Sequence, residues 1–201
     1  MSLWSNITET SWANPGIDEA TQSYRFSLRA DKRVGLVMFL AVVASLFMLL
    51  VVAYVERRDL GDWQPLSEPG VLWLNSALLV LASWCMQRAR NRAAAGASPV
   101  RALLLSGLLA VAFLAGQLFA WQALAALGYY TMANPAYAFF YLLTALHGLH
   151  LLGGLYVWAR GMRRARTATP ADLLPTLDLC AMYWHYLLLI WVVLFVLMLN
   201  T

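Results

Sequence analysis

The residues in this sequence whose types suit chemistry are three histidines, each inside an apolar stretch. His147 and His150 lie three positions apart in the run FFYLLTALHGLHLLGGLYVWAR, and His185 lies in the next run, MYWHYLLLIW. Positions i and i+3 share one face of a helix, so three imidazoles could approach one another and bind a metal ion or a haem iron. Alternatively, neutral imidazoles hydrogen-bond to hydroxyls and backbone carbonyls of neighbouring membrane helices.

The surroundings of the histidines favour the hydrogen-bonding interpretation. No Asp, Glu, Lys or Arg lies at the middle of an apolar stretch, so no carboxylate is available as a further ligand or to orient an imidazole. The same lack disfavours a carboxylate proton relay and an ion-coupled transporter. We therefore expect this chain to bind no metal and no cofactor. The candidate hydrogen-bond partners in the stretches are Ser45, Asn75, Ser76, Ser83, Gln117 and Thr144.

The composition is that of a membrane protein. Of the 201 residues, 62% are hydrophobic and 12% are charged, whereas soluble domains have roughly 45–50% and about 25%. The formal net charge of +4 does not indicate nucleic-acid binding, because the basic residues lie between the apolar stretches. Cys85 and Cys180 are too few for a disulfide framework, and we expect buried free thiols.

Five stretches approach the roughly 20 apolar residues that cross about 30 Å of hydrocarbon. Membrane strands alternate polar and apolar residues, whereas these stretches are apolar all round, so the sequence predicts an all-α, polytopic bundle of five transmembrane helices. A cytoplasmic N-terminal segment, residues 1–33, precedes a membrane domain, residues 34–201. The predicted spans are residues 34–55, 69–86, 102–124, 136–158 and 179–199.

The basic residues predict the orientation of the chain in the membrane. Of the 14 Lys and Arg residues, only Arg57 and Arg58 lie between the first and second spans, and none lies between the third and fourth. The other basic residues precede the first span or lie in the second and fourth connections. Because basic residues gather on the cytoplasmic side, the N-terminus is predicted to be cytoplasmic and the C-terminus periplasmic.

Small and aromatic residues indicate how the spans pack and where they meet the membrane surface. Gly148, Gly153 and Gly154 lie beside the paired histidines and allow another helix to approach closely. The aromatic residues near the span ends are expected to anchor the chain at the membrane interface. Candidate contacts to anionic lipid headgroups are Trp158, Arg163, Arg164 and Arg166.

The quoted motifs resemble a known family. FFYLLTALHGLHLLGG followed by AMYWHYLLLIWVVLFVLML resembles the last two helices of subunit III of the haem-copper oxidases, in its short five-helix form. Upstream, KRVGLVMFLAVVASLF, LWLNSALLVLASWCMQRA and VAFLAGQLFAWQAL resemble the preceding three helices in the same order. The resemblance covers residues 32–200, and the topology of that family agrees with the orientation predicted from the arginines.

The resemblance implies an accessory subunit that does not catalyse a reaction alone. In this family subunit III packs against the catalytic subunit I, which carries the haems and copper. It stabilises that subunit, supports proton uptake and aerobic electron transport, and holds phospholipids. The implied partners are subunit I, the other oxidase subunits and lipids, with no nucleic acid, in the bacterial cytoplasmic (inner) membrane. The residues assigned to packing or hydrogen bonding are Asn75, Gln117, Thr144, His147, Gly148, His150, Gly153, Gly154, Trp184 and His185.

The sequence departs from the family pattern at three carboxylate positions. Apolar residues stand where other members have acids: Val42 or Val43 in the first span, Ala120 after the Gln motif, and Leu188 after Trp-His. Any lipid or histidine interaction that those acids make in other members is therefore absent here or made by other residues, while the packing role remains.

Two alternatives to an oxidase subunit remain open at this stage. A related branch of the family accompanies nitric oxide reductase. From a different class of protein, a small membrane haem or metal protein would use His147, His150 and His185 as ligands.

Overall fold

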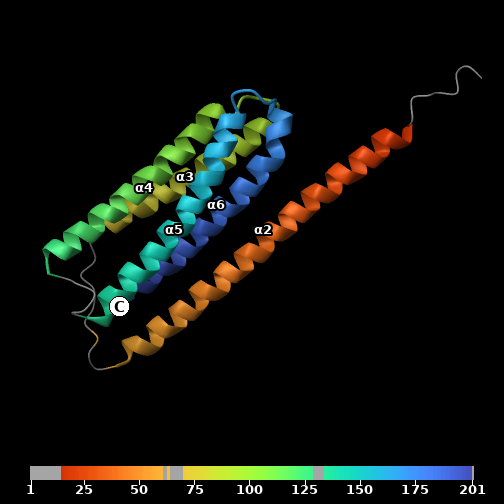
Figure 1. Cartoon of the computed structure of the whole chain (residues 1–201). Coiled ribbons are helices and arrows are strands. Elements are labelled where there is room, and N and C mark those ends of the chain that lie inside the picture. The colour runs from red at the N-terminus through yellow and green to blue at the C-terminus, as the bar shows by residue number, and fades with distance from the viewer. Residues whose placement is uncertain (1–14, 61–62, 64–69, 129–133, 201) are drawn as a thin grey trace, which may run out of the picture. The chain divides into compact units, whose positions relative to one another are not determined.

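The described part of the chain contains five helices and no strand. The computed structural model describes residues 15–60, 63, 70–128 and 134–200. The helices are α2 (Pro15–Arg58), α3 (Val71–Ala94), α4 (Val100–Ala126), α5 (Pro135–Arg164) and α6 (Pro170–Leu199) (Figure 1). The predicted all-α class is thus confirmed.

Four of these helices are long and apolar enough to cross a membrane: the part of α2 from Asp31 to Arg58, and α4, α5 and α6. The helix α3 is also long, with 24 residues, but it is less apolar. Its polar content comes from Asn75 and Gln87 within the helix and from the arginines near its C-terminal end. The prediction of five spans is therefore confirmed for four helices by length and composition.

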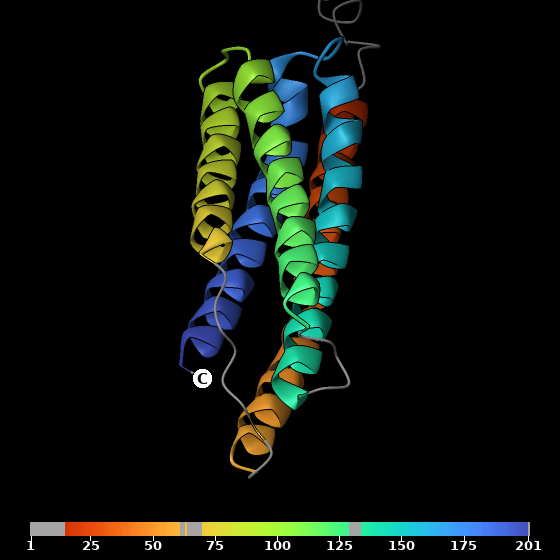
Figure 2. The ribbon, with the colours of Figure 1, turned by 90° about the vertical axis from the view of Figure 1, so that its left-hand side faces the viewer.

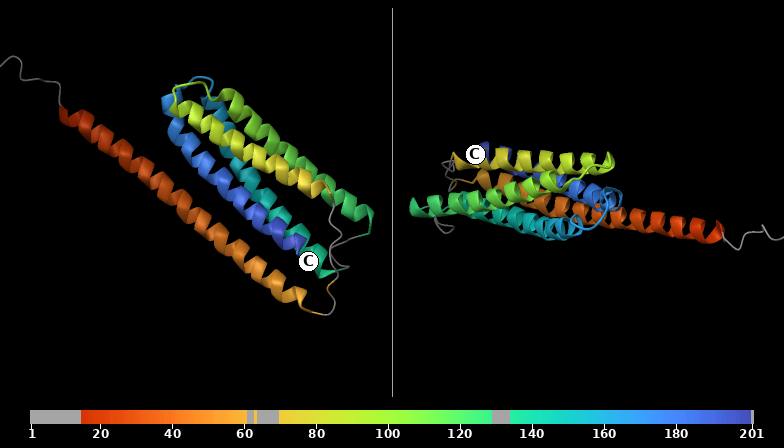
Figure 3. Two further views of the ribbon diagram at one scale, coloured as in Figure 1. Left: turned by 180° about the vertical axis from the view of Figure 1, so that it is seen from behind. Right: turned by 90° about the horizontal axis from the view of Figure 1, so that it is seen from above.

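The helices α3, α4, α5 and α6 form a closed ring in which each helix has two neighbours. The adjacent pairs are α3 with α4, α4 with α5, α5 with α6, and α6 with α3. Figure 2 and Figure 3 show these four helices side by side, with the connections 95–99 and 165–169 at the same end of the bundle. We call this the arginine end, because Arg101 and Arg164 lie beside those connections.

Local sequence signals explain where the helices of the ring begin and end. Asn134 caps α5 by accepting a hydrogen bond from Ala136 N at 3.0 Å, and Pro135 occupies the first helical position. Thr169 caps α6 in the same way, since its hydroxyl accepts from Asp172 N. Gly128, which follows α4, has φ +81°, a left-handed conformation that favours glycine.

The chain divides into two units, Met1–Phe39 and Leu40–Thr201, so the division lies within α2. In the second unit, the α2 residues Leu40, Val43, Phe47 and Tyr54 are buried. Their spacing of three, four and seven residues places them on one face of the helix. This face contacts the ring through side chains: the Phe47 ring, for example, lies 5.5 Å from the ring of His150 on α5.

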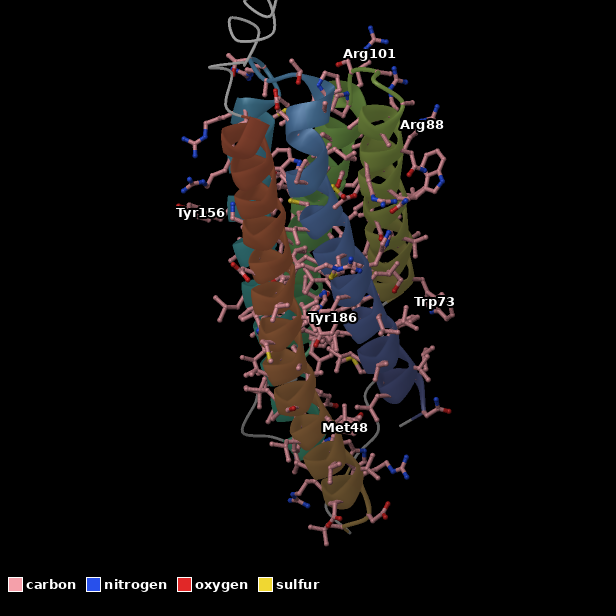
Figure 4. All side chains as sticks on the ribbon, turned by 90° about the vertical axis from the view of Figure 1, so that its right-hand side faces the viewer. Met48, Trp73, Arg88, Arg101, Tyr156 and Tyr186 are labelled. Carbon is pink, nitrogen blue, oxygen red and sulfur yellow. The ribbon has the colours of Figure 1, made fainter. Side chains whose placement is uncertain are left out.

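The outside of the second unit is apolar. Met48 on α2 and Trp73 on α3 are 64% and 59% exposed, and leucines and valines of every ring helix are exposed as well. Figure 4 shows Met48 and Trp73 pointing away from the bundle, and it shows Arg88 and Arg101 near the arginine end. An apolar exterior between charged ends is the surface that lipid chains cover.

Candidate functional site

His147 lies in the core of the ring of helices, against two aromatic side chains. This side chain is fully buried, and its ring lies 5.7 Å from the ring of Phe113 on α4 and 5.2 Å from that of Trp191 on α6. Phe113 and Trp191 also contact each other edge to face, with ring centroids 4.8 Å apart. Neither ring nitrogen of His147 has a hydrogen-bond partner among the described residues. The core therefore holds an imidazole and two aromatic rings that all contact one another.

His150 lies one turn further along α5 and uses its polar atoms locally. Its Nδ1 is 2.7 Å from the carbonyl oxygen of Leu146, so Nδ1–H donates to that carbonyl. The backbone carbonyl of His150 accepts a hydrogen bond from the hydroxyl of Tyr183 on α6, at 2.8 Å. His150 thus joins α5 to α6 through its backbone, while its ring packs on Phe47.

His185 joins α6 to α3 with both of its ring nitrogens. Nε2 lies 3.0 Å from Gln87 Oε1, and Nδ1 lies 2.6 Å from Ser83 Oγ. The amide oxygen of Gln87 can only accept, so Nε2 carries the proton and Nδ1 accepts from the serine hydroxyl. A neutral imidazole in this tautomer satisfies both bonds, as the hydrogen-bonding interpretation expects.

The structure does not bring the three histidines together. No group of three His, Cys, Asp or Glu side chains that could hold a metal ion occurs within residues 15–60, 63, 70–128 and 134–200. His185 bonds to α3 through both nitrogens, whereas His147 faces Phe113 and Trp191 in the core. The arrangement gives no geometric support to a haem or metal site built from these residues.

Asn75 and Gln117 connect α3 to α4 inside the core. The Asn75 amide donates from Nδ2 to Gln117 Oε1 at 3.3 Å, and both side chains are buried. The adjoining Gly116 provides the space, since a Cβ there would collide with the Asn75 side chain. Asn75 Oδ1 and Gln117 Nε2 have no partner among the described residues. Both residues were predicted as polar packing positions, but the sequence did not indicate that they pair.

Indole N–H groups supply two further hydrogen bonds between helices of the ring. Trp191 Nε1 donates to Ser76 Oγ at 2.9 Å, which links α6 to α3, and Trp121 Nε1 donates to Thr144 Oγ1 at 3.0 Å, which links α4 to α5. The sequence analysis did not identify Trp121 and Trp191 as bundle residues. The available signal was that a tryptophan within an apolar stretch needs an acceptor for its N–H.

Trp158 faces the bundle with its indole N–H. Nε1 donates to the backbone carbonyl of Leu103 on α4 at 2.8 Å, and the indole covers Gly107, where a Cβ would collide with it. The polar atom of Trp158 is therefore used within this chain. The other three candidate lipid contacts, Arg163, Arg164 and Arg166, are exposed at the arginine end.

The glycines of α5 face side chains of this chain. A Cβ at Gly154 would lie 2.7 Å from Tyr183 Cε1 and 3.3 Å from Trp184, so Gly154 leaves the space that these α6 side chains occupy. Gly148 faces Leu114 on α4, and a Cβ there would meet it at an ordinary distance of 3.6 Å. Trp184 is buried, and its Nε1 has no partner within the described part of the chain.

The arginine end carries one ion pair between helices. Arg90 on α3 binds the carboxylate of Asp178 on α6, and both side chains are a little under half exposed. On the same helix, the guanidinium of Arg88 lies 5.3 Å from the ring centroid of Trp84, one turn earlier on α3. The Arg90–Asp178 pair and the His185 bonds link the same two helices.

The positions where the family pattern has acids are occupied by apolar side chains with different environments. Val43 is 5% exposed and Ala120 is fully buried, whereas Val42 is 69% exposed. Val43 rather than Val42 is thus the residue of the first span that faces the core. Leu188 on α6 is partly buried.

The fold and this core define a class of protein. The described helices form an apolar bundle whose core polar groups mostly link one helix to another, which is the construction of an integral membrane protein. Comparison with known proteins identifies the family. The family described as cytochrome c oxidase subunit III matches residues 2–200.

Curated relatives agree with this match. The chain is 30% identical to cytochrome c oxidase subunit 3 of Synechocystis sp., over 81% of this chain and 72% of that one. It is 29% identical to the probable cytochrome c oxidase subunit 3 of Nocardia farcinica, over 76% of this chain and 77% of that one. It is 27% identical to cytochrome c oxidase subunit 3 of Thermostichus vulcanus, over 84% of this chain and 87% of that one. The chain therefore belongs to the cytochrome c oxidase subunit III family.

This membership confirms the resemblance and the function predicted from it. The chain is an integral membrane protein and an accessory subunit III of a terminal oxidase, and it works in a complex with other oxidase subunits. Neither a nitric oxide reductase subunit nor a separate haem or metal protein is favoured by these findings.

Proposed function

We propose that this subunit packs against the catalytic subunit I of a bacterial terminal oxidase, stabilises it during turnover and supports proton uptake. The observation that carries the proposal is the family match along residues 2–200. The core supports it, because the interhelical bonds of His185, Asn75 and Trp191 produce a rigid packing element.

The test compares the oxidase with and without this chain. Removing the gene should leave an oxidase that assembles but loses activity faster during sustained turnover, and restoring the gene should recover the lifetime. Affinity purification through a tag on this chain should recover the catalytic subunit in equal amount. If the catalytic subunit fails to co-purify, or the lifetime is unchanged without this chain, the proposal is wrong.

For the membrane, we propose five spans in the bacterial cytoplasmic membrane, with the N-terminus cytoplasmic and the C-terminus periplasmic. The helix α3 is the fifth span, because it lies between α4 and α6 and its exposed residues Trp73 and Val80 are apolar. Exposed arginines at the arginine end support its assignment to the cytoplasm. Single cysteines introduced at Ser98 and Thr167 should resist a membrane-impermeant maleimide in intact cells and react after lysis; labelling in intact cells would reverse the orientation.

For cofactors, we propose that the haems and copper of the complex belong to its other subunits. Purified alone, this chain should then show no stoichiometric Soret band and no bound copper or iron. A Soret band that is lost on replacing His147 or His150 would instead establish a haem ligand in this chain.

For the electron donor, the relatives from Synechocystis sp. and Nocardia farcinica are named cytochrome c oxidase subunits. We propose that the oxidase containing this chain also accepts electrons from cytochrome c. The purified complex should oxidise reduced cytochrome c faster than a quinol, and the opposite preference would assign it to the quinol oxidases.

A further inference from the structure

Three buried polar side chains in the core lack hydrogen bonds that their chemistry requires. Among the described residues, no partner exists for either ring nitrogen of His147, for Asn75 Oδ1 or for Gln117 Nε2. The three side chains are 0%, 1% and 4% exposed, so bulk water does not reach them. Buried polar groups in folded proteins are almost always bonded to the protein or to an ordered water.

The three side chains lie within about one helical turn of one another along the bundle. The His147 ring contacts Phe113, and Gln117 follows Phe113 by four residues, one turn or about 6 Å along α4. The His147 ring also contacts Trp191, whose indole donates to Ser76, the residue next to Asn75. Asn75 in turn bonds to Gln117. These contacts, together with the sequence neighbours, place the three side chains in the same part of the core.

Gln117 lies between the two contacts that join this part of α4 to α5. Phe113 meets His147, while Trp121 bonds to Thr144, so α5 runs antiparallel to α4. Gln117 lies one turn after Phe113 and one turn before Trp121. It therefore lies on the part of α4 that faces α5 between His147 and Thr144. No direct hydrogen bond joins the two side chains, although both are described in full.

We propose that the core holds one ordered water molecule that bridges His147 to the Asn75–Gln117 pair. The water accepts a hydrogen bond from Gln117 Nε2 and donates to Asn75 Oδ1 and to the unprotonated nitrogen of His147. Three bonds are what a buried water typically makes. The ligand must both donate and accept, because Gln117 offers an N–H and Asn75 offers a carbonyl oxygen. A metal cation fits poorly, since the N–H of Gln117 would point at it.

The water links α5 to α3 and α4 at the centre of the ring. Without the water, the hydrogen bond between Asn75 and Gln117 joins α3 to α4 but does not reach α5. His147 on α5 contacts its neighbours only through aromatic rings among the contacts described above. The inference rests on the core of this chain and is independent of the docking to subunit I proposed above, so either can fail without the other.

The direct test is a high-resolution cryo-electron microscopy map of the oxidase complex that contains this chain. The expected result is an isolated density peak within about 2.7–3.2 Å of a His147 ring nitrogen and of at least one amide atom of Asn75 or Gln117. A core without such a peak, or a direct hydrogen bond between His147 and Gln117, would overturn the proposal.

A variant pair tests the role of the histidine. The same complex carrying His147→Leu should lack the density peak. In water-edited solid-state NMR, it should also lose the transfer of magnetisation from water to the side-chain amide of Gln117. Ser106→Ala is the control, because Ser106 is a fully buried residue of α4 with an unpartnered hydroxyl, seven residues before Phe113. It should leave both signals intact. If the peak persists in His147→Leu, the histidine does not hold the water; the wild-type map decides the proposal should the variant fail to assemble.

Discussion

Replacing Gly107 with alanine should destabilise the bundle, because the space beside this glycine is occupied by the indole of Trp158. The added Cβ would collide with the ring, and the ring is held by its hydrogen bond to Leu103 O at 2.8 Å. Displacing the indole costs about 1 kcal/mol for the interhelical hydrogen bond and roughly 1–3 kcal/mol for overpacking. We expect a total loss of about 2–4 kcal/mol in the free energy of unfolding.

The assay is reversible unfolding of the purified chain in mixed micelles by increasing mole fraction of SDS, followed by far-ultraviolet circular dichroism. Two matched controls make the same chemical change. A Cβ at Gly148 meets only Leu114 at 3.6 Å, and a Cβ at Gly35 meets nothing within 4 Å. Gly148→Ala and Gly35→Ala should therefore unfold within about 0.5 kcal/mol of the natural chain. If Gly107→Ala unfolds with them, the packing argument is refuted.

A double variant separates collision from loss of glycine flexibility. Trp158→Leu alone removes the indole and its hydrogen bond, and it leaves space beside residue 107. In that background Gly107→Ala should cost little, so the two changes together should be less destabilising than their sum. Additive effects would show that the glycine acts without the indole.

Three further predictions concern the links between α3 and α6 and the arginine end. His185→Leu should lower the free energy of unfolding by about 1–2 kcal/mol in the same assay, since Ser83 and Gln87 lose their shared partner; an unchanged midpoint would contradict the bridge. Arg90→Ala should cost only about 0.5 kcal/mol in that assay, because the pair with Asp178 is partly exposed; a loss above about 2 kcal/mol would contradict a weak, solvated ion pair. Replacing three exposed arginines with alanine should weaken the binding of phosphatidylglycerol to the detergent-solubilised chain by up to about 1 kcal/mol each, in a salt-dependent way, and equal lipid binding at low salt would exclude this role for Arg163, Arg164 and Arg166.

The sequence predicted the presence and order of the helices more accurately than it predicted where they begin. The predicted span 179–199 ends with α6, but α6 begins at Pro170, because a capping threonine and a proline start the helix before the apolar stretch. Likewise α2 begins at Pro15, well before the predicted span 34–55. Hydropathy locates the part of a helix that crosses hydrocarbon, whereas hydrogen bonding and caps determine the helix itself.

The sequence also indicated which residues are polar in the core, but it could not pair them. Asn75 and Gln117 were both identified from their types, and their bond depends on the register of α3 against α4, which Gly116 permits. The partner of Gly107 could not be predicted either, since it is an indole 51 positions away in the chain. Such contacts depend on helix rotation, which an all-apolar surface leaves unspecified.

The core has apolar residues at positions where the family pattern has acids, and it also contains the buried, unpartnered imidazole of His147. A buried acid paired with a histidine must repay the desolvation of both groups, and replacing such a pair by apolar residues is often neutral or stabilising. With Val43 and Ala120 buried at positions where the family pattern has acids, the buried residues that the structure describes include no Asp, Glu, Lys or Arg whose charge must be balanced. A neutral imidazole then requires only neutral partners, and one water between His147, Asn75 and Gln117 supplies the donor for its unprotonated nitrogen without any acid. The apolar side chains of Val43 and Ala120 thus pack into the core without any charge to balance.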